Sequence, residues 1–174
     1  MSMPEFSRRI ALDTVGEGGR DVAVEADADE RQALARRFDL YALDRLDATA
    51  RLTLRSGIVH AEGTLHGTGA QRCVVTDAPV PVLIDEAFHL RFVDDAPEGD
   101  EIELSEEDCD TLPLDGNAID LGEAVAETFA LALPPFPRAP DADAVLRAAG
   151  VKSEEEAGPF GSLAALKDKL ARGE

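Results

Sequence analysis

The segment ATARLTLR at residues 48–55, followed by SG at 56–57 and IVHAEGTLH at 58–66, carries the pattern that decides the fold. In the first run, Ala50, Leu52 and Leu54 alternate with Thr and Arg, which is the period of a strand with one buried face. Ser-Gly is a turn signal, so two strands are predicted to fold back on each other here. This hairpin is the centre from which the rest of the fold is built.

Shorter patterns on both sides extend the hairpin into a sheet. Further strands are predicted at residues 6–12, 21–26, 73–76 and 80–93. Pro81 places the start of the longest strand at a sheet edge, and Gly67 and Gly69 predict a bend after residue 66. Because consecutive strands are joined by short turns, the pattern favours an antiparallel meander over βαβ units.

Helical periodicity interrupts the strands in five places, at residues 27–38, 40–46, 120–132, 141–149 and 162–170. Asp27 or Asp29 is expected to cap the first helix, and Asp120 with Glu123 resembles a capping box at the third. The expected class is α+β: an antiparallel β-sheet or partly closed β-barrel with helices packed on it, an extended acidic loop and a helical C-terminal part. Residues 1–140 are predicted to form one domain and residues 141–174 a helical extension.

Charge is distributed unevenly along the 174 residues, whose formal net charge is −19. Residues 1–75 carry a net charge of −2, whereas residues 76–174 carry −17. Residues 94–110 alone hold ten acidic side chains and no basic one, which is typical of a solvated loop. No run approaches the ~18–20 apolar residues that span a bilayer, so we expect a cytoplasmic protein with no membrane contact. We also expect the protein to be a monomer.

No residue set in the sequence spells out a reaction. It contains no phosphate-binding loop, nucleophile elbow or dinucleotide fingerprint. His60, His66 and His89 lie on predicted strands, where exposed histidines are the simplest interpretation. We therefore expect no enzyme activity, no catalytic residue, no cofactor and no metal.

Several short motifs, in order, resemble the YceD family of large ribosomal RNA subunit accumulation proteins. They are Gln71-Arg72-Cys73 after a Gly-rich strand, Asp120-Leu121 opening a helix that leaves through Leu133-Pro134, and the late Pro159-Phe160-x-x-Leu-x-x-Leu. The runs at residues 30–35 and 71–76 are similar to the alphaproteobacterial branch. The family has a Cys-x-x-Cys pair, but here Ala70 takes the place of the first Cys, and a lone Cys73 cannot complete a four-ligand metal site.

The resemblance implies a non-enzymatic factor for accumulation and processing of 23S ribosomal RNA and for large-subunit assembly. Its expected partners are large-subunit ribosomal RNA or a pre-ribosomal particle, and a basic ribosomal protein. Alternatives are a small-ligand-binding antiparallel β module and an RNA-processing nuclease.

Two surfaces are predicted to bind these partners. Residues expected to contact RNA or a partner are Arg8, Arg9, Arg36, Arg37, Arg51, Arg55, Gln71 and Arg72. The acidic partner surface is expected to include Asp94, Asp95, Asp100, Glu101, Glu106 and Glu107. Whether the arginines share one face, or pair instead with carboxylates such as Glu25, Glu30, Asp44 and Asp47, is left open by the sequence.

Overall fold

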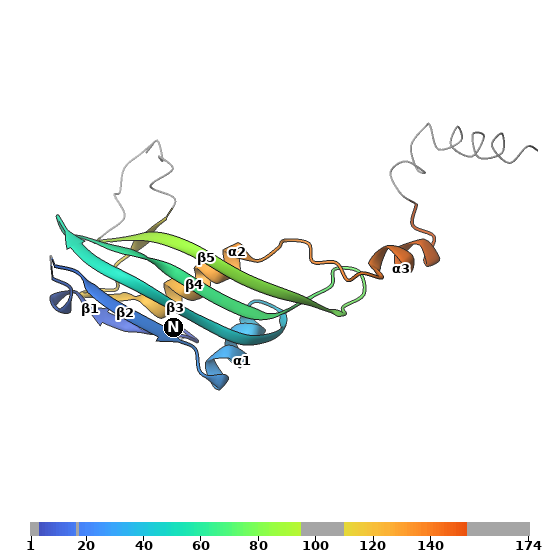
Figure 1. Cartoon of the computed structure of the whole chain (residues 1–174), viewed down its shortest axis with the longest axis horizontal. Coiled ribbons are helices and arrows are strands. Elements are labelled where there is room, and N and C mark those ends of the chain that lie inside the picture. Colours follow the sequence, from blue (N-terminus) through green and yellow to red (C-terminus); the bar gives the residue numbers. More distant parts are fainter. Residues whose placement is uncertain (1–3, 17, 95–109, 153–174) are drawn as a thin grey trace, which may run out of the picture. The chain divides into compact units, whose positions relative to one another are not determined.

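The computed structural model of the chain describes residues 4–16, 18–94 and 110–152 (Figure 1). The chain divides into two compact units. The first holds residues 1–71 and 81–135, and the second holds residues 72–80 and 136–174. The expected division at residue 140 stays a prediction, and the predicted last helix lies outside the described residues.

A five-stranded sheet forms the first unit, in the order β2-β3-β4-β5-β6. Its strands are β2 (Arg20–Glu25), β3 (Leu40–Arg55), β4 (Ile58–Arg72), β5 (Pro79–Val93) and β6 (Thr111–Pro113). The β3–β4 pair is the antiparallel hairpin that the sequence predicts, with Arg55 opposite Ile58. Because β6 runs parallel to β5, the sheet is mixed, and it stays open rather than closing into a barrel. A second, two-stranded sheet pairs β1 (Arg9–Ala11) with β7 (Ala118–Asp120).

The strands of the hairpin are longer than the sequence predicts. Residues 40–46 belong to β3 and not to a helix, so that prediction is wrong. Leu40, Leu43 and Leu46 are all buried, and register shifts between Leu40 and Ala42 and between Leu43 and Arg45 bring them to the same face. A spacing of three residues therefore imitates helical periodicity where it reflects two bulges in a strand.

The predicted bend at Gly67 and Gly69 is also wrong, because both lie inside β4. A Cβ on Gly67 would come within 2.4 Å of the Phe129 ring, and one on Gly69 within 2.3 Å of the Ala42 carbonyl oxygen. These glycines are required by close packing, which is the other common reason for glycine within a strand.

Two helices complete the first unit, α1 (Ala28–Arg37) and α2 (Leu121–Ala132). Asp27 caps α1 in a full capping box with Glu30. Asp120 caps α2 by accepting the Glu123 N–H, and it also accepts the Arg8 N–H at 2.7 Å. The Glu123 carboxylate does not complete the second box, because it pairs with Arg37 instead.

One face of the sheet is covered and the other is open to solvent. In Figure 1, α2 lies behind β4 and β5. Leu34 of α1 and Phe129 of α2 belong to the same core cluster as Leu46, Leu52 and Leu65 of the central strands. Side chains that alternate with these core residues along β3, β4 and β5 point away from the helices, so they form the open face.

The described part of the second unit contains a turn and a short helix. Residues 73–78 form a turn rather than the predicted strand, closed by the Cys73 N–H donating to the Ala78 carbonyl at 2.9 Å. The short helix α3 (Ala142–Ala148) confirms the helix predicted at residues 141–149.

A 3₁₀ turn, η1 (Leu12–Thr14), follows β1 in the first unit. Within the described part of the chain, no helix is long and apolar enough to cross a membrane.

Candidate functional site

The open face of the sheet carries polar and charged side chains at alternate positions. On β3 they include Arg51 and Arg55, because Ala50 and Leu52 face the core. His60 and Glu62 lie on the same face of β4, and the register places Glu62 opposite Arg51. The pairing of β3 with β4 thus fixes the relative positions of these side chains.

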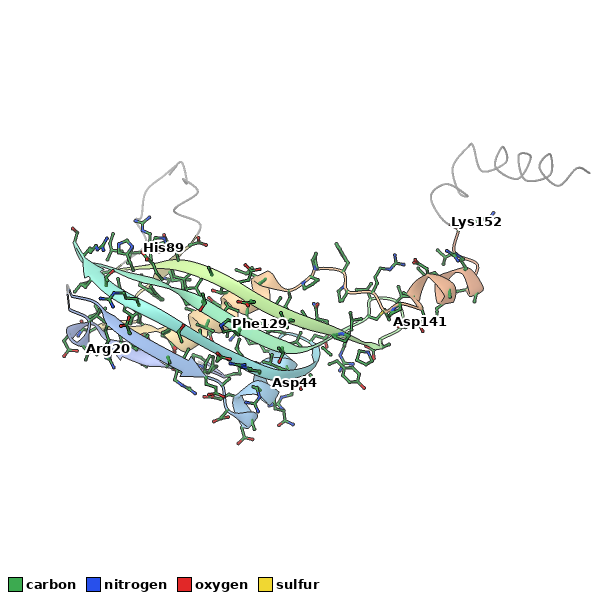
Figure 2. The ribbon with its side chains drawn as sticks, viewed as in Figure 1. Arg20, Asp44, His89, Phe129, Asp141 and Lys152 are labelled. Carbon is green, nitrogen blue, oxygen red and sulfur yellow. The ribbon has the colours of Figure 1, made fainter. Side chains whose placement is uncertain are left out.

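Arg55, His89 and Arg91 lie close enough to His60 to lower its pKa, and we call these four residues the basic cluster. The His60 and His89 rings stack with centroids 5.7 Å apart, and His60 Nδ1 lies 3.4 Å from His89 Nε2. His89 is labelled in Figure 2. At this separation the two nitrogens share one hydrogen bond, whose direction depends on the tautomers. The basic cluster therefore draws its residues from three strands, β3, β4 and β5.

The pKa of His60 is lowered by its surroundings. Burial lowers the pKa of His60, and the neighbouring charges of His89, Arg55 and Arg91 lower it further, against a smaller opposite effect from Glu62. A carboxylate also lies beside the cluster, because Glu62 Oε1 lies 3.8 Å from His89 Nε2.

Most of the predicted arginines lie elsewhere and are paired with carboxylates. Five of the seven form ion pairs: Arg8 with Glu30, Arg9 with Asp115, Arg37 with Glu5 and Glu123, Arg51 with Asp21, and Arg72 with Asp77. Of the suggested carboxylates, Glu30 is therefore a partner of a predicted arginine. The structure does not bring the seven together on one face.

Arg8 and Arg37 hold the amino-terminal segment against the helices. The Arg8 guanidinium donates to both Glu30 carboxylate oxygens at 2.7 and 2.8 Å and stacks 4.7 Å from the centre of the Phe6 ring. Hydrogen bonds to the Glu123 carboxylate raise the pKa of Arg37 well above its usual range. Such bidentate and networked pairs fix structure and leave few donors for a ligand.

Three further predicted residues complete the comparison. Gln71 is buried, and its side-chain amide donates to the Pro134 carbonyl at 2.9 Å. Arg36 and Arg55 are exposed, and neither forms an ion pair with another described residue. Only Arg55 of the predicted set belongs to the basic cluster, with Arg51 nearby on the same strand face.

Sequence reasoning missed His60, His89 and Arg91 as site residues. The sequence analysis interprets the two histidines as exposed strand residues but assigns them no binding role. Their mutual approach was not visible, because it depends on the pairing of β4 with β5. Of the predicted acidic surface, Asp94 is exposed, whereas residues 95–109 lie outside the described chain.

Cys73 is held by backbone N–H groups. Its Sγ accepts from Ala139 at 3.2 Å and from Val75 at 3.4 Å, and the residue is only 4 % exposed. These N–H groups, with the Thr76 hydroxyl, lower the pKa of the thiol to about 7. Within residues 4–16, 18–94 and 110–152, no group of three or more His, Cys, Asp or Glu side chains is placed to hold a metal ion.

Comparison with known proteins identifies the family. The family described as "Large ribosomal RNA subunit accumulation protein YceD" matches residues 61–167, which is more than half of the chain. Neither a curated protein nor a solved structure matches. The matched region begins near the start of β4, so it includes Cys73, His89 and Arg91 but not Arg55 or His60. Because the match covers more than half of the chain, the chain belongs to the YceD family.

Proposed function

We propose that this protein is a non-enzymatic factor that supports accumulation and processing of 23S ribosomal RNA and assembly of the large subunit. It would act in the cytoplasm by binding RNA, a basic ribosomal protein, or both. Family membership supports the broad role, since the family is described by accumulation of the large ribosomal RNA subunit. The alphaproteobacterial branch stays a prediction.

The basic cluster is the observation that supports direct contact with RNA. Binding a nucleic acid requires cations that neutralise phosphates, and the other predicted arginines are mostly engaged by carboxylates. Arg55 and Arg91 flank two imidazoles whose ring nitrogens can donate to phosphate oxygens when protonated. A nucleic-acid strand would cross β3, β4 and β5 on the open face.

The rest of the surface limits which RNA can bind. A chain of charge −19 repels phosphates in general, so only a segment that reaches the open face gains attraction. Binding should therefore be local, moderate and strongly dependent on salt. The acidic remainder suits a second contact with a basic ribosomal protein, which would approach quickly and dissociate as salt rises.

The RNA contact can be tested by fluorescence anisotropy with transcribed fragments of large-subunit RNA over a range of salt. We expect Arg55→Ala to weaken binding, and to reduce the log–log salt slope by about 0.7 on single-stranded RNA, since one phosphate contact is lost. Adding Arg91→Ala should reduce the slope again by a similar amount. Arg36→Ala removes the same charge from the exposed surface of α1 and should change neither quantity.

A cellular assay completes the test. In a strain lacking the gene, the wild-type chain and Arg36→Ala should restore the level of mature 23S ribosomal RNA, whereas the Arg55→Ala/Arg91→Ala variant should not. Equal RNA affinity and equal rescue by all variants would rule out the basic cluster as the RNA contact. Failure of purified wild-type protein to bind either large-subunit RNA or large-subunit proteins would overturn the proposed function itself.

A further inference from the structure

Among the described residues, β5 has a neighbouring strand on its outer side only near its end. Strand β6 pairs only with residues 91–93, where the Arg91 N–H donates to the Asp110 carbonyl at 2.9 Å. Backbone groups in a strand alternate in direction with a period of two, so the amides of Ala87 and His89 face the same side as that of Arg91. In the part of the chain that the structure describes, no strand pairs with residues 83–90 on this side.

A groove of about 440 Å³ runs beside this edge, between β5 and α2. Five consecutive β5 residues, 86–90, line one wall, which means that the groove follows the strand rather than crossing it. Its apolar lining includes Phe88, Leu112 and Leu131, and Leu131 is 87 % exposed. A strand added to β5 would lay alternate side chains on this apolar surface of α2.

The charge around the groove selects among possible occupants. Glu86, Asp110 and Glu127 line it, and His89 is its one basic lining residue. A second copy of the chain would bring the same carboxylates against these, and the chain's own run at 94–110, with ten acidic side chains and no basic one, would be repelled as well. The lining therefore complements a segment rich in Lys or Arg with apolar residues at alternate positions.

We propose that the outer edge of β5, over residues 83–90, takes up an extended basic segment of a partner protein as an additional strand. Main-chain hydrogen bonds to Ala87 and His89 would bind the segment, apolar side chains would cover Leu131, and lysines or arginines would pair with Glu86 and Glu127. This inference rests on the part of the proposed function that gives the chain a basic protein partner, and it does not depend on RNA binding.

The test uses a matched pair of variants in the full-length protein. Ala87→Pro removes the edge-facing N–H without breaking a described hydrogen bond, whereas Ala87→Val keeps that N–H and favours a strand. The probe is a labelled 12-residue peptide of alternating lysine and valine, followed by fluorescence anisotropy. We expect Ala87→Pro to weaken binding about tenfold, because the hydrogen bond to Ala87 and the alignment of its neighbour are lost together, and Ala87→Val to bind as the wild type does.

Two controls keep the test decisive if Ala87→Pro folds poorly. The same peptide methylated on alternate backbone nitrogens should bind the wild-type protein about tenfold more weakly, since it cannot donate to the edge. Glu86→Lys should weaken binding of the unmodified peptide more than Glu62→Lys, which makes the same charge change on the open face. Hydrogen exchange at the amides of Ala87 and His89 should slow when the peptide is bound.

Three outcomes would overturn the edge proposal. They are equal peptide binding by Ala87→Pro and Ala87→Val, unchanged exchange at Ala87 and His89 in the complex, and exchange in the free protein that slows with protein concentration, which would assign the edge to a second copy. The proposed function is judged separately with purified large-subunit proteins. If they bind wild type and Ala87→Pro equally, the edge proposal fails while the protein-partner role stands; if they do not bind wild type at all, that role fails.

Discussion

Arginines near the amino terminus and arginines on the open sheet face occupy opposite environments. Arg8 is 34 % exposed in its side chain and donates to both oxygens of Glu30 and to two backbone carbonyls. Arg55 is exposed and lies beside two imidazoles and Arg91. The comparison shows that a cluster of arginines in a sequence says little about a binding surface until the carboxylate partners of each arginine are known.

The physical difference lies in the charge that surrounds each group. At Arg8, the hydrogen bonds to Glu30 raise the arginine pKa and lower that of the carboxylate, so the pair is held together in its charged form. At the basic cluster, cations lie near one another and lower the pKa of His60 beyond the effect of its burial. The first arrangement stabilises the fold, whereas in the second the neighbouring cations disfavour the protonated form of His60.

The largest effect that tests this comparison is loss of stability in Arg8→Ala. The variant leaves Glu30 without its bidentate partner in a half-buried position, so we expect the free energy of unfolding to fall by about 2 kcal/mol. Arg8→Lys should lose most of the same stability, because a lysine cannot donate to both oxygens in the fork geometry. Urea denaturation measures both changes.

Arg36→Ala serves as the matched control, since Arg36 is exposed and should change stability by less than about 0.5 kcal/mol. Below its unfolding transition, Arg8→Ala should bind RNA as the wild type does. Reduced RNA affinity in folded Arg8→Ala would mean that the two arginine environments are not separate in function.

A second test concerns pH at the basic cluster. The pKa of His60 is lowered in the folded protein, so between that value and 6.5 the unfolded chain binds more protons than the folded chain. Stability contributed by this group is therefore present above pH 6.5 and is lost as pH falls through the folded pKa. We expect the wild type to lose more stability than His60→Gln on acidification, as measured by urea denaturation at several pH values.

RNA binding should change in the opposite direction. Protonation of His60 adds a cation beside Arg55 and Arg91, so affinity should increase as pH falls below 6.5, and less so in His60→Gln. Bound RNA should in turn raise the pKa of His60, which can be followed by the NMR signals of the imidazole ring. An RNA affinity with the same pH dependence in wild type and His60→Gln would show that RNA does not meet this histidine.

The sequence predicts well those parts of the fold that depend on neighbouring residues. The β3–β4 hairpin, the cap at Asp27 and the cap at Asp120 each rest on residues within a few positions of one another. It predicts poorly the features that depend on distant contacts. The bulges at the start of β3 resemble a helix in spacing, and Gly67 resembles a turn until Phe129 is seen against it.

The candidate site follows the same rule. Arg9 pairs with a residue 106 positions away and Arg37 with one 86 positions away, so no local pattern could show that they are engaged. His60 and His89 are 29 positions apart and meet only because β4 and β5 are paired. Arg55 is the member of the basic cluster that the sequence analysis includes among the binding arginines.

Arg51 offers the smallest and most discriminating test, because it lies on the open face and yet has a carboxylate partner. Its guanidinium is 3.0 Å from Asp21, and the two side chains are 54 % and 78 % exposed. Asp21→Asn should alter stability by less than about 1 kcal/mol, since exposed ion pairs contribute little. It should strengthen RNA binding about twofold at low salt and not at high salt, because it releases a cation next to the basic cluster.

Asp77→Asn is the matched control for this last variant. It makes the same change of charge, weakens the pair with Arg72 in the other unit, and places asparagine at a positive φ of 58°, which asparagine tolerates. If the open face binds RNA, Asp21→Asn should strengthen binding more than Asp77→Asn does. Equal gains would mean that RNA responds only to the net charge of the chain, and the distinction between paired and clustered arginines would then have no bearing on RNA binding.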